Sequence, residues 1–238
     1  MNNTEITKHL KLPFQFDEQK LLTDLAKVLN TEWKPHFNIK DYSGKWKSIA
    51  LYAPNGNSNH IFASPNETVP ILETKILKGC NYFKEVLSQF HCPLLSVRLL
   101  NLGAGAIIKP HKDYNLGYEN DCFRLHVPIT TNPEVEFILD DTLLQMEPGE
   151  CWYTNVNYTH SVENLGTTDR IHLVLDGQRN SWSDELFLSL VPKECLFVEE
   201  TKYYDIDTIA RIIEELNQSQ PQGYLDAIKD LKNRMNLE

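Results

Sequence analysis

Two histidines and one aspartate have the types and spacing of metal ligands. His111 and Asp113, in IIKPHKDY (107–114), are two residues apart, so both would point to the same face of a β-strand. A lone His-x-Asp pair is weak evidence, but His160, in YTHSVEN, supplies a third ligand. Two histidines and one carboxylate leave positions open on Fe(II), as a cosubstrate and O2 require.

Two further polar pairs accompany these ligands, Arg124 with His126 and Arg170 with His172. Apolar residues separate the members of each pair, which predicts strands buried on both faces, one apolar and one polar. Buried polar side chains are costly unless they bind something. Arg170, ten residues after His160, could clamp a carboxylate in fork geometry. We expect Arg124 to orient a carboxylate of the substrate, because a buried unpaired cation would be costly. For His172, a core histidine bonded to the backbone is the alternative.

Four other histidines and the cysteines have no potential metal ligands at a suitable spacing. Four histidines have no carboxylate at strand spacing, and we expect them at the surface or at the ends of elements: His9, His36, His60 and His91. The five cysteines are dispersed and form no CxxC pair, which predicts free thiols in a reducing cytoplasm and argues against a cysteine zinc site: Cys80, Cys92, Cys122, Cys151 and Cys195.

The composition limits the partners. The chain has 238 residues and a net charge of -10, so general binding to nucleic acid or to anionic membranes is disfavoured. No apolar run approaches the ~20 residues that span a bilayer, and MNNTEITKHLKLPF has no signal-peptide core. These features predict a cytoplasmic protein that binds neither nucleic acid nor membrane.

The elements that must position these residues follow from periodicity. Residues 17–30 predict an amphipathic helix capped by Asp17, and 44–57 a strand that runs into a turn. Residues 70–90 predict a second helix, or two helices broken at Gly79. From 94 to 178, seven short β-like runs separated by turn signals predict a compact antiparallel sandwich or small barrel: LLSVRLLNL, AIIKPHKD, FRLHVPIT, EVEFILDD, LLQMEPGE, CWYTNVN and RIHLVLDG.

Three regions result. Residues 1–93 are expected to pack helices and a strand on the core, 94–178 to form the β core, and 179–238 to form a helical extension. Two apolar stripes in the extension, over 206–216 and 225–235, predict a helical hairpin on the β core. A homodimer contact through these helices is the alternative use of such stripes.

Four blocks together resemble the aspartyl/asparaginyl β-hydroxylase family and the free L-proline hydroxylases related to it. They are IIKPHKDY, FRLHVPI, MEPGECWYTNVNYTHSVEN and DRIHLVLDG. The resemblance is strong over 94–178 and weaker upstream. It implies an Fe(II)- and 2-oxoglutarate-dependent dioxygenase on a double-stranded β-helix, a jelly-roll or cupin-like core. Its expected reaction is hydroxylation of an unactivated C–H bond of an amino acid, free or in a peptide.

The resemblance also assigns roles. It places His111, Asp113 and His160 at the iron ligands and Arg170 at the distal carboxylate of 2-oxoglutarate. Arg124 and His126 fall on a block that lines the pocket and contacts the carboxylate of cosubstrate or substrate. We expect His126 beside the cosubstrate and Arg124 beside the substrate.

Two departures favour a small amino acid substrate. The peptidyl aspartate hydroxylases of animals lack the carboxylate ligand, whereas this chain has Asp113, and they carry an arginine where Cys122 stands here. Both features are nearer the proline-hydroxylase pattern. Alternatives that remain open are the same chemistry on a sugar acid or a lipid acyl chain, and a cupin-like metal-binding protein or zinc hydrolase. Arg170 and Arg124 argue against the last two.

Overall fold

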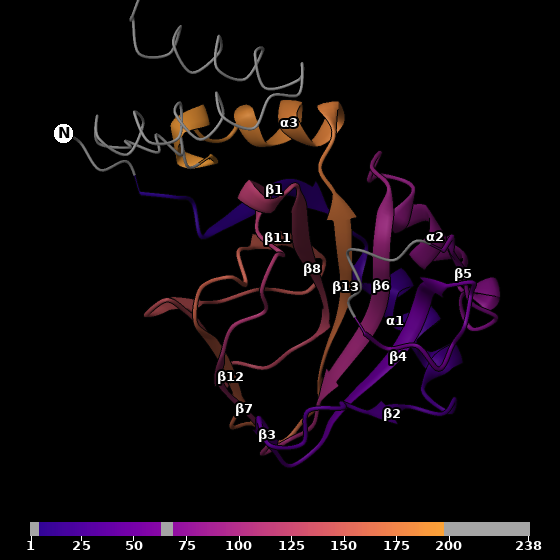
Figure 1. Ribbon diagram of the computed structural model, residues 1–238. Coiled ribbons are helices and arrows are strands. Elements are labelled where there is room, and N and C mark those ends of the chain that lie inside the picture. Colours follow the sequence, from indigo (N-terminus) through magenta and orange to yellow (C-terminus); the bar gives the residue numbers. More distant parts are fainter. Residues whose placement is uncertain (1–4, 63–68, 198–238) are drawn as a thin grey trace, which may run out of the picture. The chain divides into compact units, whose positions relative to one another are not determined.

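The computed structural model describes residues 5–62 and 69–197. Within them, the mainly β architecture that we expected is confirmed (Figure 1). Two antiparallel sheets form a β-sandwich, as the seven short β-like runs separated by turn signals predicted. The predicted C-terminal hairpin, and with it the expected homodimer contact, lies beyond the described residues. No helix in the described part is long and apolar enough to cross a membrane.

The larger sheet has the strand order β1-β11-β8-β13-β6-β4-β2, and β5 pairs with β4. The smaller sheet has the order β10-β9-β12-β7-β3. The strands of the larger sheet are β1 (His9–Gln15), β2 (Lys34–Pro35), β4 (Trp46–Pro54), β5 (Ile71–Glu73), β6 (Leu94–Leu102), β8 (Cys122–Thr130), β11 (Glu150–Thr154) and β13 (Arg170–Gln178). Those of the smaller sheet are β3 (Tyr42–Ser43), β7 (Ile107–His111), β9 (Val135–Leu139), β10 (Thr142–Leu144) and β12 (His160–Asn164).

Helices cover the outer face of the larger sheet. They are α1 (Glu18–Val28), α2 (Asn81–Leu87) and α3 (Ser181–Leu188), with short 3-10 turns at Leu77–Gly79, Tyr118–Asn120 and Lys193–Cys195. Figure 1 shows α1 and α2 on the side of the larger sheet away from β7 and β12. The predicted cap of α1 is confirmed, since the Asp17 side chain accepts from the backbone N–H of Lys20 at 3.0 Å.

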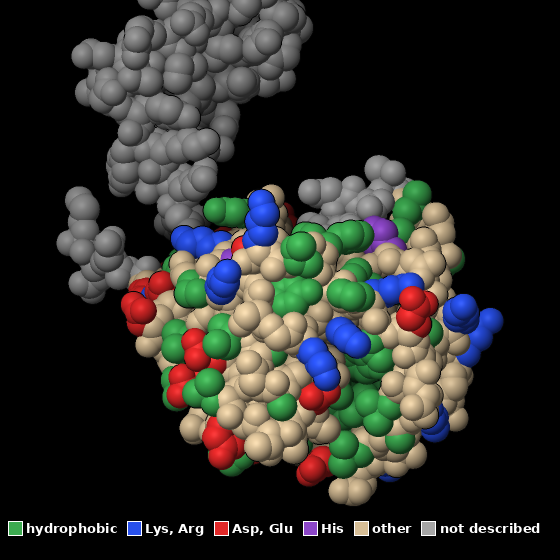
Figure 2. All heavy atoms as spheres, turned by 90° about the horizontal axis from the view of Figure 1, so that it is seen from below, with side chains coloured by type: hydrophobic (Ala, Val, Ile, Leu, Met, Phe, Trp, Pro, Cys, Tyr) green, Lys and Arg blue, Asp and Glu red, His purple; other side chains and the backbone are tan. Residues whose placement is uncertain are grey.

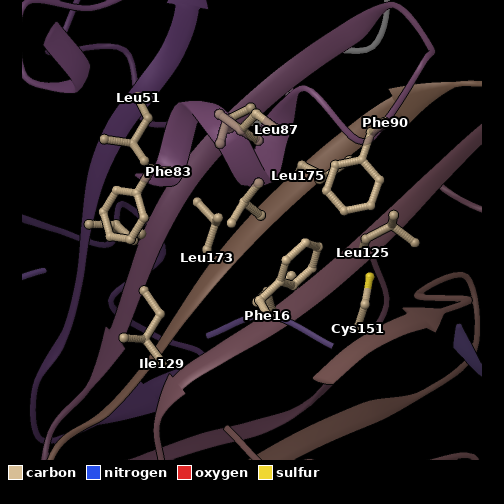
Figure 3. Packing of buried hydrophobic residues seen from close by; sticks show 14 of the residues in the cluster. Phe16, Leu51, Phe83, Leu87, Phe90, Leu125, Ile129, Cys151, Leu173 and Leu175 are labelled. Atoms are coloured by element: carbon tan, nitrogen blue, oxygen red, sulfur yellow. The ribbon is translucent and has the colours of Figure 1, made fainter. Parts of the chain in front are cut away.

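The main apolar core lies between these helices and the larger sheet (Figure 3). Alternate residues of β8 and β13 point into it, while their neighbours point into the sandwich. Figure 3 shows the contributions of both layers: Phe16, Leu51, Phe83, Leu87, Phe90, Leu125, Ile129, Cys151, Leu173 and Leu175. The opposite phase of the central strands is polar and also buried: Ser96, Arg98, Arg124, His126, Arg170, His172 and Asp176. The prediction that both phases of these strands are buried is confirmed.

Several local predictions need correction. The start of 70–90 is not helical, because 71–73 pairs with β4 and α2 begins only at Asn81. LLQMEPGE is not one strand: Leu143 and Leu144 end β10, Glu150 begins β11, and the chain turns between them at Gly149 with φ +79. Besides the short strands β2, β3 and β5, the strands β1 and β12 were not predicted, because Pro13 interrupts one and the other, HSVEN, is mostly polar. All five cysteines are free thiols, as predicted.

Candidate metal centre

Three potential ligand side chains converge where β7 and β12 meet. His111 and His160 are direct cross-strand partners, and their ring centroids are 4.2 Å apart. Asp113 lies just beyond the end of β7, where its backbone N–H donates to the carbonyl of Val156 at 2.9 Å. One ligand atom from each of the three residues lies within 4.8 Å of the others. The structure thus brings the predicted trio together, although Asp113 is not on the strand itself.

Hydrogen bonds orient both imidazoles for metal binding. Nδ1 of His111 is 2.8 Å from the carbonyl oxygen of Lys109, and Nδ1 of His160 is 3.1 Å from that of Tyr158. A carbonyl only accepts, so each Nδ1 carries the hydrogen and each Nε2 keeps its lone pair for a metal. Burial, reinforced by the nearby His111, lowers the pKa of His160 to about 4, so this ring is neutral at pH 7.

Arg124 holds the carboxylate of this trio. Its Nη1 donates to Oδ2 of Asp113 at 2.5 Å, while Oδ1 lies 4.0 Å from Nε2 of His111. Burial disfavours the charged carboxylate, but Arg124 and then His160 and His111 together outweigh burial and lower the pKa of Asp113 to about 2. One oxygen is therefore engaged with an arginine, and the other faces the histidines.

A buried ionic cluster supports Arg124 from behind. Asp176 is 1% exposed and accepts from Nε of Arg124 at 2.7 Å, from Nη2 of Arg98 at 2.8 Å and from the hydroxyl of Ser96 at 2.7 Å. Arg124 thus pairs with two carboxylates. The premise that it is an unpaired cation was wrong, because the sequence did not reveal Asp176 as its cross-strand partner. Its contact with a substrate stays a prediction.

Arg170 differs, because no carboxylate pairs with it among the described residues. It is 2% exposed, its Nη2 donates to Nδ1 of His172 at 2.9 Å, and its guanidinium lies 5.7 Å from the ring centroid of Phe137. Burial lowers its pKa to about 9, which leaves it protonated at pH 7. Nearby, neither ring nitrogen of His126 has a hydrogen-bond partner within the described part of the chain. A buried cation and a buried imidazole without partners are costly, which favours an anionic ligand here.

All these groups line one cavity of about 370 Å³: the three potential ligands with Arg98, Arg124, His126 and Arg170. His36 also lines the cavity, stacked on Trp46 with ring centroids 3.5 Å apart. Burial, followed by the charge of Arg98, lowers the pKa of His36 to about 4. His36 follows β2 directly, as expected for a histidine at the end of an element, but its place in the cavity wall was not expected.

Arg98 and Asp176 were not predicted as residues of the site, although their sequence neighbours indicate that both are buried. Each is a charged residue with an apolar neighbour on one or both sides, in LLSVRLLNL and RIHLVLDG, on a strand buried on both faces. Such residues are rarely buried without a partner or a ligand.

On the outside of the molecule, basic and acidic side chains are interspersed over the face that Figure 2 shows.

Comparison with known sequences supports one family. A profile of the aspartyl/asparaginyl β-hydroxylases matches residues 15–180, a span that contains every residue of the site. The chain belongs to this family. Two curated relatives, L-proline cis-3-hydroxylases 1 and 2 of Streptomyces sp, are 27% and 26% identical over 172 residues. Each match covers 71% of this chain, but the chain spans only 59% of the length of either relative.

A solved structure of another protein resembles the fold of this chain. It is described as an oxidoreductase of the 2OG-Fe(II) oxygenase family from Burkholderia pseudomallei. The two structures superpose with a TM-score of 0.50 over 73% of this chain and 86% of the other, at 12% sequence identity. At this identity the likeness concerns the fold alone.

Proposed function

We propose that the protein is an Fe(II)- and 2-oxoglutarate-dependent dioxygenase that hydroxylates an unactivated C–H bond of an amino acid. The observation that carries this proposal is the combination of two oriented imidazoles, one carboxylate and an uncompensated arginine in a single cavity. A zinc hydrolase would need the first three groups but not Arg170. Membership of the family and the curated proline hydroxylases support the same reaction.

The donor set fits the metal. His111, Asp113 and His160 would hold Fe(II) through two Nε2 atoms and one carboxylate oxygen, which is the facial triad of non-haem iron oxygenases. When bound, Fe(II) and 2-oxoglutarate supply O2 activation, in which one oxygen atom enters the C–H bond and the cosubstrate becomes succinate and CO2. Arg124 would keep Asp113 ionised and oriented in this process.

The residues opposite the metal ligands fit the cosubstrate. Arg170 would pair with the distal carboxylate of 2-oxoglutarate and so acquire the counter-charge that it lacks. His126, neutral and without partners, would donate a hydrogen bond to the same ligand from the floor of the cavity. Burial of these contacts excludes water from the reacting centre.

The substrate would carry a carboxylate toward Arg98 and Arg124. These arginines lie side by side on Asp176, and the Nε of Arg98 has no partner among the described residues. Arg98, Arg124, Asp113 and Asp176 sum to zero charge, and Arg170 adds one positive charge. Because Fe(II) and the 2-oxoglutarate dianion cancel, the loaded site would retain one positive charge, which favours a substrate that turns a carboxylate toward these arginines. The curated relatives act on L-proline, and a small amino acid is our proposal for this chain.

The strand order supports the finer fold that this function needs. From β6 to β13, successive strands alternate between the two sheets except at the β9–β10 hairpin, and they give the orders β6-β13-β8-β11 and β7-β12-β9-β10. This is the connectivity of a jelly roll, so we infer a double-stranded β-helix with the metal ligands at one mouth.

The proposal can be tested spectroscopically. Anaerobic addition of Fe(II) and 2-oxoglutarate should produce the weak visible charge-transfer band of the chelate, and substrate screening should show amino-acid-stimulated succinate formation. His160→Ala should abolish the band, because it removes one of three ligands, whereas the exposed His91→Ala should leave it unchanged. A wild-type protein that binds Fe(II) but shows no band with saturating 2-oxoglutarate would rule out the proposed cosubstrate.

A further inference from the structure

The cavity of the candidate metal centre has a cationic inner end and a different outer end. Arg98 and Arg124, on β6 and β8 of the larger sheet, are each 5% exposed. The segment 36–41 connects β2, at the edge of the larger sheet, to β3, at the edge of the smaller sheet. It contributes a more exposed part of the wall, formed by His36, Phe37, Asn38 and Asp41. The outer end thus carries a carboxylate, whereas the buried end carries guanidinium groups.

Hydrogen bonds fix Asp41 beside the strand that carries His111. The backbone carbonyl of Asp41 accepts from the N–H of Lys109, two residues before His111, at 2.8 Å. Its Oδ2 accepts a hydrogen bond from the side-chain amide of Asn38. Asp41 is half-buried, and among the described residues it has no cationic partner and no donor to its Oδ1. A positioned carboxylate with one free oxygen and no counter-ion is suited to accept from a cationic donor.

Aromatic rings at the same end of the cavity favour the same kind of group. Phe37 and Phe62 both line the cavity, are 58% and 40% exposed, and have ring centroids 4.8 Å apart. The faces of aromatic rings attract cations, because their π-electrons make the faces negative. Lys112 also lines the cavity, but it is exposed, so water and salt screen its field. The outer end therefore suits an ammonium group better than a second carboxylate.

The charge of Asp41 also fits a ligand with two opposite charges. Under the proposed function the loaded site retains one positive charge, which Asp41 offsets. A ligand without net charge then leaves the cavity neutral, if its carboxylate faces the arginines and its cation faces Asp41. A sugar acid or a fatty acid has the carboxylate but no cation, and an amino acid whose nitrogen is acylated has lost its ammonium group.

We propose that Asp41 binds the ammonium group of the substrate, so that the cavity selects a free, zwitterionic amino acid over its des-amino and N-acylated analogues. This proposal rests on the proposed function, because it assigns the carboxylate of the substrate to Arg98 and Arg124. Asp41 acts on the substrate and not on the metal, which makes it a specificity-determining residue. The charge-assisted hydrogen bond to its free oxygen provides the discrimination.

Titration calorimetry of the full chain, with saturating Mn(II) and 2-oxoglutarate, tests this selectivity. L-Proline is the first probe, since the curated relatives act on it, and cyclopentanecarboxylate has the same ring without the amine. The wild type should bind the amino acid at least about tenfold more tightly than the des-amino acid. If L-proline does not bind, each of the other neutral amino acids is compared with its des-amino acid in the same way. A wild type that prefers none of these amino acids would overturn the proposal.

Asp41→Asn separates recognition from a structural role. The amide keeps an oxygen for Asn38 but loses the charge, so the Kd of the amino acid should rise about tenfold. The Kd of the des-amino acid should stay equal or fall, because a repulsive charge is removed. Glu163→Gln is the matched control, because Glu163 is a half-buried carboxylate on β12 that does not line the cavity and has no ion pair among the described residues. Weaker binding of both ligands in Asp41→Asn, or unchanged binding of both, would refute the proposal.

The result can be told apart from that of the proposed function. If the protein binds the amino acid selectively but forms no succinate with Fe(II), 2-oxoglutarate and O2, the dioxygenase is refuted and the role of Asp41 remains. If a des-amino acid stimulates succinate formation as well as the amino acid does, the dioxygenase remains and the role of Asp41 is refuted.

Discussion

At the scale of single residues, one buried carboxylate organises the cationic side of the site. Asp176 accepts hydrogen bonds from Arg98, Arg124 and Ser96, and Arg124, held in this way, also donates to Asp113. A potential metal ligand is thereby oriented by a residue two contacts away. Arg170 is the opposite case, a buried cation that no carboxylate pairs with among the described residues.

Loss of the charge on Asp176 should destabilise the fold. Asp176→Asn keeps the shape but leaves Arg98 and Arg124 without their buried counter-ion, and we expect a loss of about 3 to 5 kcal/mol in the free energy of unfolding. Urea denaturation measures this loss. The control Asp121→Asn breaks an exposed pair with Arg179 and should cost less than about 1 kcal/mol. Equal losses in the two variants would contradict the role of the buried cluster.

Loss of the guanidinium of Arg124 should weaken metal binding without removing a ligand. Arg124→Gln no longer holds Asp113 ionised and oriented, and we expect a 10- to 100-fold lower affinity for Mn(II) or Co(II) by calorimetry. Lys112→Gln removes a positive charge at the mouth of the same cavity and serves as the control. An unchanged affinity in Arg124→Gln would show that the ion pair does not orient the ligand.

At the scale of elements, Asp24 fastens α1 to α2. This buried side chain, on the inner side of α1, accepts from the backbone N–H groups of Tyr82 and Phe83 at 2.6 and 2.9 Å. It therefore satisfies the first turn of a helix that has no side-chain cap of its own. Both helices cover the outer apolar face of the strands that carry the site.

Removal of this carboxylate should loosen α2 selectively. Asp24→Ala leaves two backbone donors without acceptors, and we expect the free energy of unfolding to fall by about 2 to 3 kcal/mol. Hydrogen exchange should show the greatest loss of protection in the amides of α2. Gln19→Ala, at an exposed position of α1, should change stability by less than about 0.5 kcal/mol. Uniform loss of protection over all elements would argue against the local role.

The sequence predicted the elements with strong periodicity and missed those defined by pairing. The apolar alternation of 94–102 and 170–177 identified β6 and most of β13, because both phases are buried. HSVEN has no such pattern, and only its pairing with β7 and β9 makes it a strand. Residue types and spacing were enough to predict that His111, Asp113 and His160 lie together. The ion pairs of Arg124 could not, since they depend on which residues face each other across strands.

At the scale of the whole molecule, burial keeps a set of histidines neutral. Burial is the largest cause in each case, and the pKa lies below the ordinary value of 6.5 for His9, His36, His126, His160 and His172. As the pH falls below 6.5, these residues take up protons at a higher pH in the unfolded chain than in the folded one. Acid therefore favours the unfolded state, and stability falls as the pH decreases.

This linkage predicts a measurable slope. Between pH 6 and pH 5, each buried histidine contributes up to about 1.4 kcal/mol of lost stability per pH unit. His172→Gln can still accept from Arg170 but cannot be protonated, so it should reduce the slope by about that amount. Urea titrations at several pH values measure it, with the exposed His91→Gln as the control. A slope identical to that of the wild type in His172→Gln would show that the ring is protonated in the folded protein.

The pairing of His111 with His160 has a mechanical consequence. An ion bound by both histidines would act as a reversible cross-link between points about 50 residues apart in the chain. It would close a loop of the chain that contains β8, β9, β10 and β11. Pulled from its two ends, the loaded protein would have to break this link before the enclosed strands could extend. In a single-molecule pulling experiment, the metal-loaded protein would then release a shorter contour length in its first unfolding event than the metal-free protein.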